Sequence, residues 1–113
     1  MATWSGACGA SADDAKQNGT AMSLTSSMSV TSATHYLGVR FQNVTVSQGA
    51  TINSATLTVD VPSTSGDSPN GVTWYGELAT NAAAFTTTAS DITNRARTSA
   101  TTVWSGSDIG TGD

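Results

Sequence analysis

Apolar residues alternate with serines and threonines along much of this chain, which is the pattern of strands that bury one face and expose the other. The clearest run is 52–61, where every second residue from position 55 is apolar: Ala55, Leu57, Val59 and Val61. Pro62 ends this predicted strand, because proline cannot donate to a hydrogen-bonded ladder.

The same alternation marks four further segments, namely 22–30, 36–46, 72–78 and 101–104. Within 36–46 the apolar positions shift by one residue near Gln42, which predicts a bulge or bend. Spacings of about 8–12 residues between strands are those of a sandwich or barrel. The pattern predicts a single all-β domain over residues 1–113, an antiparallel β-sandwich with no long helix.

Polar and glycine-containing segments separate the expected strands. Residues 11–19 are expected to form a polar turn that ends in Asn-Gly, a pair that favours positive φ and a chain reversal. Gly49 is expected to supply positive φ in another turn, and Gly38 inside a strand predicts a close backbone approach. Residues 81–85 are compatible with one helical turn.

Charged side chains are few, and four basic against eight acidic residues give a net charge of −4. A nucleic-acid binder needs a dense basic surface to displace counterions, and anionic membranes attract basic segments. We therefore expect neither nucleic acid nor a membrane as a partner. A single cysteine and a single histidine leave little for a metal centre, and no metal or cofactor is expected.

No arrangement of residues points to catalysis, so the protein is not expected to be an enzyme. His35 has no nucleophile motif beside it and is expected at the surface, at the start of a strand. Asp13 and Asp14 lack the spacing of a calcium loop and are expected to be solvated turn carboxylates. Lys16 is expected in the same polar turn, and Cys8 is either free or bridged between two copies.

Aromatic residues are the candidates for binding. Trp4, Tyr75 and Trp104 are assigned to this role, because exposed rings can stack on sugars and mark interfaces. Trp74 lies in register with the apolar residues of its strand and is expected in the core.

Charge pairing supplies the candidates for a structural role. Arg40 is expected to pair across a sheet with Glu77 or Asp60. Together with Trp74 and Gly49, Arg40 and Glu77 are assigned to holding the fold together.

One long segment resembles a known family. It reads Tyr36-Leu-Gly-Val-Arg-Phe-Gln-Asn-Val-Thr-Val-Ser-Gln-Gly-Ala-Thr-Ile-Asn-Ser-Ala-Thr-Leu57. This is similar to the "GLRF-x-N-V-x-I-P-x-GATI-x-SA-x-L" segment of DNRLRE-like jelly-roll domains, which occur in bacterial surface proteins and phage virion proteins. Further pieces resemble the same family in the same order: 11–15, 75–79, 81–85, 91–95 and 103–104.

The resemblance implies a jelly-roll sandwich. Such domains usually continue past the strand that resembles 103–104, through a helix and closing strands. The resemblance therefore implies a sandwich whose open edge is completed by a neighbouring chain, since exposed edges are rarely left long and bare.

Two functions follow as expectations. The first is a structural protein of a phage-like virion or other extracellular assembly, such as a tail, fibre or capsid decoration, whose partners are copies of itself or other virion proteins. The N-terminus has neither a basic patch nor an apolar run, which predicts synthesis in a cytoplasm without a signal peptide. The alternative is a carbohydrate-binding or surface-adhesion module cut from a larger exported protein, with glycans as partners.

Overall fold

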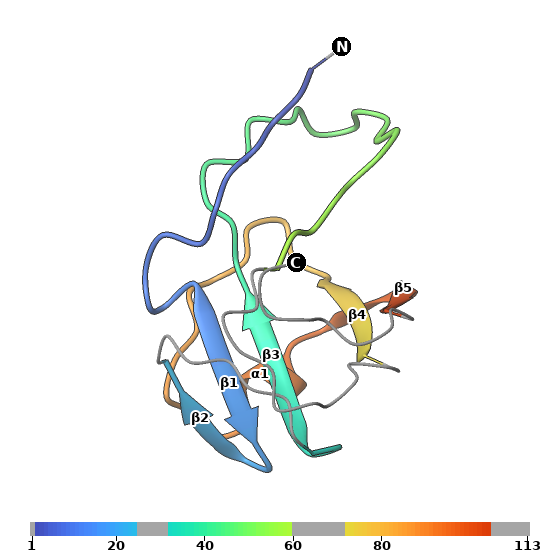
Figure 1. Cartoon of the computed structure of the whole chain (residues 1–113). Coiled ribbons are helices and arrows are strands. Elements are labelled where there is room, and N and C mark those ends of the chain that lie inside the picture. Colours follow the sequence, from blue (N-terminus) through green and yellow to red (C-terminus); the bar gives the residue numbers. More distant parts are fainter. Residues whose placement is uncertain (1, 25–31, 60–71, 105–113) are drawn as a thin grey trace.

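The computed structural model describes residues 2–24, 32–59 and 72–104. Within these ranges the chain forms five strands in two small antiparallel sheets, with a single short helix (Figure 1). The expected all-β class is confirmed at this level. None of the helical structure in the described ranges is long and apolar enough to cross a membrane.

The first sheet has the strand order β2-β1-β3. Its central strand β1 (Asp14–Asn18) is flanked by β2 (Ala21–Ser23) and β3 (His35–Val39). The expected reversal after Asn18 is confirmed, because β1 and β2 form a hairpin in which Gly19 has a φ of 59°. The expectation that 11–19 is a turn throughout is wrong, because 14–18 is the middle strand of this sheet.

The second sheet pairs β4 (Val72–Glu77) with β5 (Arg97–Trp104), with a bulge between Tyr75 and Glu77. Between these strands the chain forms the one-turn helix α1 (Asp91–Asn94), which packs against β1 and β3 of the first sheet. The helical turn considered for 81–85 is absent, and the chain turns into helix only at Asp91.

Residues 41–59, called the arm below, contain no strand, so the strands predicted over 52–59 and 41–46 are wrong in this structure. The arm runs out beyond both sheets, beside the N-terminal segment, then turns and comes back to the level of the sheets at its end (Figure 1). A strand needs a hydrogen-bonded neighbour, and no ladder reaches the arm from the described residues. Gly49 turns the arm with a φ of 81°, as expected. The end of the predicted strand, 60–61, lies outside the described residues.

The buried interior lies between β1, β3 and α1. Among the described residues the buried apolar side chains are Ala15 and Phe85, and the buried polar ones are Asp13 and Gln17. A Cβ at Gly38 would collide with the ring of Phe85, so the close approach expected at this glycine is confirmed. Trp74, expected in the core, is only half-buried.

Candidate functional site

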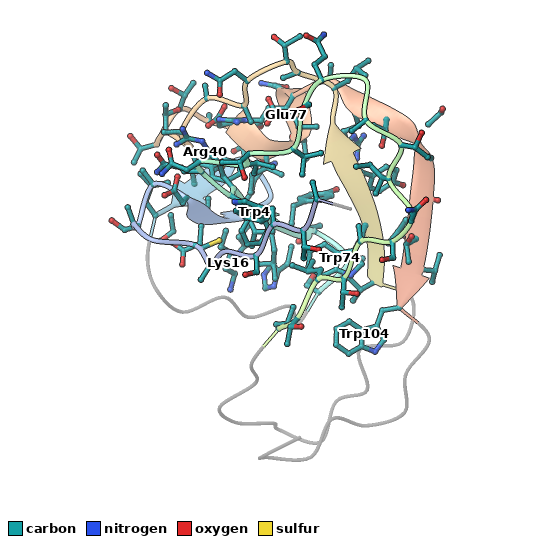
Figure 2. All side chains as sticks on the ribbon, turned by 90° about the horizontal axis from the view of Figure 1, so that it is seen from above. Trp4, Lys16, Arg40, Trp74, Glu77 and Trp104 are labelled. Carbon is teal, nitrogen blue, oxygen red and sulfur yellow. The ribbon has the colours of Figure 1, made fainter. Side chains whose placement is uncertain are left out.

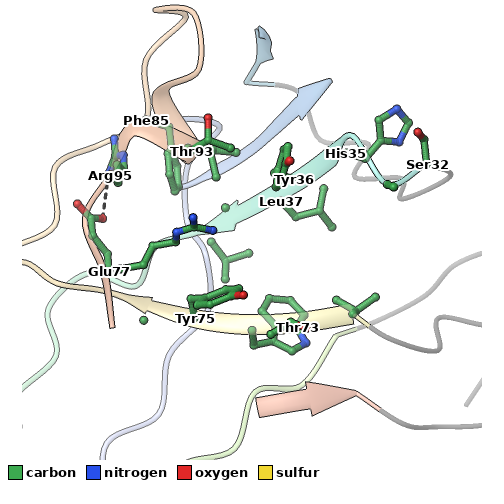
Figure 3. Close-up of a pocket in the computed structure, with 18 residues that line it drawn as sticks. Ser32, His35, Tyr36, Leu37, Thr73, Tyr75, Glu77, Phe85, Thr93 and Arg95 are labelled. Atoms are coloured by element: carbon green, nitrogen blue, oxygen red, sulfur yellow. Dashed lines mark hydrogen bonds and ion pairs between the residues drawn. The ribbon is translucent and has the colours of Figure 1, made fainter. Parts of the chain in front are cut away.

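A cavity of about 670 Å³ lies between β3 and β4, the neighbouring edge strands of the two sheets (Figure 3). This volume is within the range of pockets that bind ligands, about 300–1,000 Å³. Apolar side chains form much of its wall, including Leu37, Val39, Val72, Trp74 and Phe85. We call this cavity the groove.

Every residue of β3 and every residue of β4 lines the groove. Because successive side chains of a strand point to opposite faces, a cavity touched by all of them extends along the strand edges as well as along one face. β3 is an edge strand of its sheet, paired with β1 on one side only within the described residues. β3 and β4 run in the same direction along the groove (Figure 1, Figure 3).

Arg95 closes one end of the groove and uses all five of its N–H donors. Its Nε and one terminal nitrogen bind the Asp91 carboxylate at 3.3 and 3.0 Å, and Nη1 donates to Glu77 Oε2 at 3.0 Å. The remaining donors reach the carbonyls of Ala83 and Ala84 at 2.8 and 2.9 Å. A guanidinium has only these five donors, so Arg95 has none left for a ligand. Its role is to hold the end of the groove in place.

The same cluster shifts two titrating groups. Burial alone would raise the pKa of Asp91, but hydrogen bonds from Arg95 and from the backbone N–H of Thr86 outweigh it and lower the pKa. Burial alone would lower the pKa of Arg95, but its hydrogen bonds to Asp91 and Glu77 raise the pKa. Both groups are therefore held in their charged forms.

Phe85 joins this cluster to the sheet. The guanidinium carbon of Arg95 lies 4.4 Å from the centre of its ring, and the glycine backbone at position 38 lies against the ring. A second cation–π pair stands beside it, with Arg97 placed 4.8 Å from the ring centre of Tyr75. This end of the groove therefore combines two arginines with two aromatic rings.

Arg40 and Glu77, expected to pair with each other, have different partners. Arg40 binds Asp13 Oδ1 at 2.8 Å, and Glu77 binds Arg95. Gln42 donates to the other oxygen of Asp13 at 2.7 Å. Arg40 directly follows β3 and Asp13 directly precedes β1, and the antiparallel pairing of these strands brings the two side chains together. Asp60, the other partner considered for Arg40, lies outside the described residues.

Asp13 is 1% exposed, so the expectation of a solvated turn carboxylate is wrong for this residue. Asp14 is half-buried, and its Oδ1 is buried without a hydrogen-bond partner in the structure. The part of the chain that the structure describes holds no cluster of three or more histidine, cysteine or acidic side chains that could bind a metal ion.

Gln17 is a buried polar residue with a structural role that the sequence pattern conceals. Its Nε2 donates to the carbonyl of Gly19 at 2.7 Å and to Thr93 Oγ1 at 2.9 Å, while its Oε1 accepts the N–H of Thr93 at 3.1 Å. These bonds attach α1 to β1. The only signal in the sequence is the period-two spacing of Asp13, Ala15 and Gln17, which a hydropathy pattern overlooks because two of the three are polar.

The three candidate binding aromatics lie in three different places. Trp4 packs edge-on against Phe41, with ring centres 6.0 Å apart, and donates its indole N–H to the Asn43 carbonyl at 2.9 Å. Tyr75 is 47% exposed and lines the groove. Trp104 ends β5 opposite Val72, on the other face of the sheet from Tyr75. Figure 2 shows Trp104 well apart from Trp4, so the three rings form no common platform.

The remaining candidates are placed as follows. His35 begins β3, as expected, and lines the groove. Lys16 lies in β1, not in a turn. Cys8 is a free, half-buried thiol whose Sγ lies 3.4 Å from the carbonyl oxygen of Arg40. Burial raises the pKa of this thiol, against the lowering effect of its backbone hydrogen bond.

Neither a family model, nor a curated protein, nor a solved structure matches the chain. The functional argument therefore rests on the groove. It combines apolar walls, two strand edges and an arginine whose donors are all used within the protein.

Proposed function

We propose that this protein is a non-catalytic structural module of a phage-like virion or another extracellular assembly. It assembles with copies of itself or with other proteins of the particle through strand edges and apolar patches. In this proposal the two small sheets are part of a jelly-roll-like sandwich that a neighbouring chain completes. The resemblance of residues 36–57 to DNRLRE-like domains supports the same proposal.

The observation that carries this proposal is the groove between β3 and β4. The two sheets meet along the edge strands β3 and β4, which share no ladder among the described residues. Between these strands lies a cavity of about 670 Å³, and the described residues bury only two apolar side chains. As far as the described residues go, this cavity with strand edges along it can receive another strand, because added strands gain both ladder hydrogen bonds and apolar burial.

The alternative, a carbohydrate-binding or adhesion module, is favoured by one observation. Tyr75 is an exposed ring inside the groove with Arg97 against it, and such a pair can contact a sugar ring and its hydroxyls. The absence of a common platform with Trp4 and Trp104 makes this the second candidate.

Light scattering behind a sizing column tests the proposal on the whole 113-residue chain. A structural module is expected to give dimers or larger particles whose mass falls on dilution. A monomer at every concentration would contradict self-assembly, and a monomer that binds immobilised glycans with loss on Tyr75→Ala would establish the alternative.

A further inference from the structure

The turn between β1 and β2 carries an Asn-Gly pair, a dipeptide that is prone to a spontaneous reaction of the backbone with the asparagine side chain. Asn18 ends β1 and is exposed, and Gly19 follows it with a φ of 59°. Asn18 pairs with Ala21, so Gly19 and Thr20 form the loop of a hairpin. The reactive pair therefore lies at the surface, within reach of water.

The reaction joins two neighbouring groups of the chain. The backbone nitrogen of Gly19 bonds to Cγ of Asn18, and the side-chain nitrogen leaves as ammonia, taking the proton of the backbone N–H. Glycine favours this step because it has no Cβ to hinder the approach. Water then opens the cyclic succinimide at either carbonyl carbon. One product is aspartate, and the other is isoaspartate, whose backbone runs through the former side chain.

Both backbone groups of Gly19 are held in the folded chain. Its N–H donates to the carbonyl of Thr34 at 3.1 Å, one position beyond the last pair of the ladder between β1 and β3. Its carbonyl accepts a hydrogen bond from Nε2 of Gln17 at 2.7 Å, and Gln17 is only 1% exposed. The attacking nitrogen is therefore bonded to β3, and it reaches the Asn18 side chain only after it leaves Thr34.

The conformation of Asn18 opposes the reaction as well. Ring closure needs the next backbone nitrogen to be eclipsed with the Cβ of the asparagine. A residue in an antiparallel strand has a ψ of about +135°, which turns that nitrogen well away from Cβ. Asn18 is paired on both sides, with Ala21 of β2 and His35 of β3. This pairing must open before the ring can close.

We infer that Asn18–Gly19 is a latent isoaspartate site, which the pairing of β1 with β3 holds unreactive. The site goes beyond the proposed function, because its reaction needs no second molecule. Since ammonia leaves, the amide does not form again. Each chain that reacts therefore keeps a permanent mark that the end of its central strand has opened.

Isoaspartate at this position breaks the contacts that surround it. It adds one methylene group to the backbone of the middle strand and one negative charge at the end of that strand. The longer backbone displaces Gly19 from Thr34 and from Gln17, whose side chain also holds Thr93 of α1. Aspartate, the other product, adds the charge but leaves the backbone length unchanged.

The first experiment compares the folded with the unfolded chain. The whole 113-residue chain is incubated in mildly alkaline buffer, either in guanidinium chloride or in sodium chloride of the same ionic strength, and is then digested with trypsin. Cleavage after Lys16 and Arg40 releases peptide 17–40, in which Asn18 is the single asparagine. Mass spectrometry measures its conversion. The second Asn-Gly pair, 70–71, lies outside the described residues and falls in a different peptide.

Conversion of Asn18 is expected to be at least tenfold slower in the folded chain, and a tenfold lag corresponds to about 1.4 kcal/mol of opening free energy. Equal rates in a chain that stays folded by circular dichroism would overturn the inference. An absence of conversion in guanidinium chloride would overturn it too.

A matched pair of glycine variants tests whether β3 supplies the restraint. Gly38→Ala places a Cβ against Phe85 from within β3, whereas a Cβ at Gly9 meets no atom within 4 Å. Gly38→Ala is expected to speed the conversion of Asn18 by roughly fivefold to a hundredfold, and Gly9→Ala is expected to leave it unchanged. Equal rates in the two variants would contradict a restraint from β3. If Gly38→Ala does not fold, hydrogen exchange of the unaltered chain decides: a protected Gly19 N–H is expected, and an unprotected one overturns the inference.

The last experiment separates the longer backbone from the added charge. Anion exchange purifies the modified chains, and the isoaspartate form is compared with Asn18→Asp, which carries the same charge on a backbone of ordinary length. The isoaspartate form is expected to unfold at a lower concentration of guanidinium chloride than Asn18→Asp. Equal midpoints would show that the contacts of Gly19 do not hold the end of β1, and they would overturn the inference.

Discussion

Among the described residues, the most polar strand, β1, is the most buried one, whereas the regular apolar alternation of the arm is exposed. Asp13, directly before β1, and Gln17, within it, are each 1% exposed, whereas Ile52 in the arm is 61% exposed. A sequence pattern based on hydropathy places these two regions the other way round.

Hydrogen-bond pairing explains the burial of the polar region. A buried polar group without a partner costs about 1–3 kcal/mol. Both oxygens of Asp13 accept hydrogen bonds, and the amide of Gln17 makes three. The arm is the opposite case, since its apolar side chains are exposed and its backbone pairs with no strand among the described residues.

The largest expected effect comes from breaking the pairing of Asp13. In Asp13→Ala the guanidinium of Arg40 loses its partner, and we expect a loss of about 2–3 kcal/mol in the free energy of unfolding. The value lies below that of a fully buried pair, because the Arg40 side chain is 21% exposed. Urea unfolding measures it.

Asp14→Ala is the matched control for this substitution. The Asp14 carboxylate, which this substitution removes, has one buried oxygen without a hydrogen-bond partner. We therefore expect the free energy of unfolding to change by less than about 1 kcal/mol. Similar losses in the two variants would show that hydrogen-bond pairing does not decide which carboxylate is buried.

The next largest effect is expected at an apolar contact in the same interior, between Gly38 and Phe85. Gly38→Ala places a Cβ against the ring of Phe85, and overpacking of this kind costs about 1–3 kcal/mol. Adding Phe85→Leu makes room and is expected to recover part of the loss. Gly9→Ala, where a Cβ meets no atom within 4 Å, is the control and is expected to be nearly neutral in thermal unfolding.

Acid is expected to have a smaller effect. The pKa of Asp91 is lower in the folded chain than in the unfolded chain, so its ion pair with Arg95 stabilises the fold above the unfolded pKa near 4. That contribution is lost as the pH falls from about 4 through the folded pKa. Asp91→Asn is expected to flatten this part of the stability profile, and an unchanged profile would contradict the assignment.

The smallest effect is expected in the arm. Leu57→Ser removes an exposed leucine, and at a concentration where the chain is monomeric it is expected to change the free energy of unfolding by less than about 0.5 kcal/mol. A larger loss would mean that the arm is packed on its own chain in solution, and it would remove the contrast with β1.

Local rules predicted the local features well. The reversal after Asn18, the positive φ of Gly49 and the close approach at Gly38 follow from the conformational freedom of glycine, which needs no knowledge of distant residues. The strands over 72–77 and 97–104 overlap those predicted from alternation at 72–78 and 101–104.

Long-range partners could not be predicted in the same way. From the sequence alone, several acidic residues are possible partners of Arg40. Only the observed pairing of β1 with β3 selects Asp13. The strand-like arm shows the same limit, because alternation indicates which face would be buried but not whether a neighbour is present to pair with it.

The separation of these partners along the chain has a consequence for the order of events during synthesis. Asp13 is 27 residues from Arg40, and Gln17 is 76 residues from Thr93. β1 therefore leaves the ribosome long before the residues that satisfy its buried side chains exist. Such distant contacts slow folding, because long loops must close before the contacts form. The central strand of the first sheet is expected to be among the first segments made and among the last to become protected from hydrogen exchange.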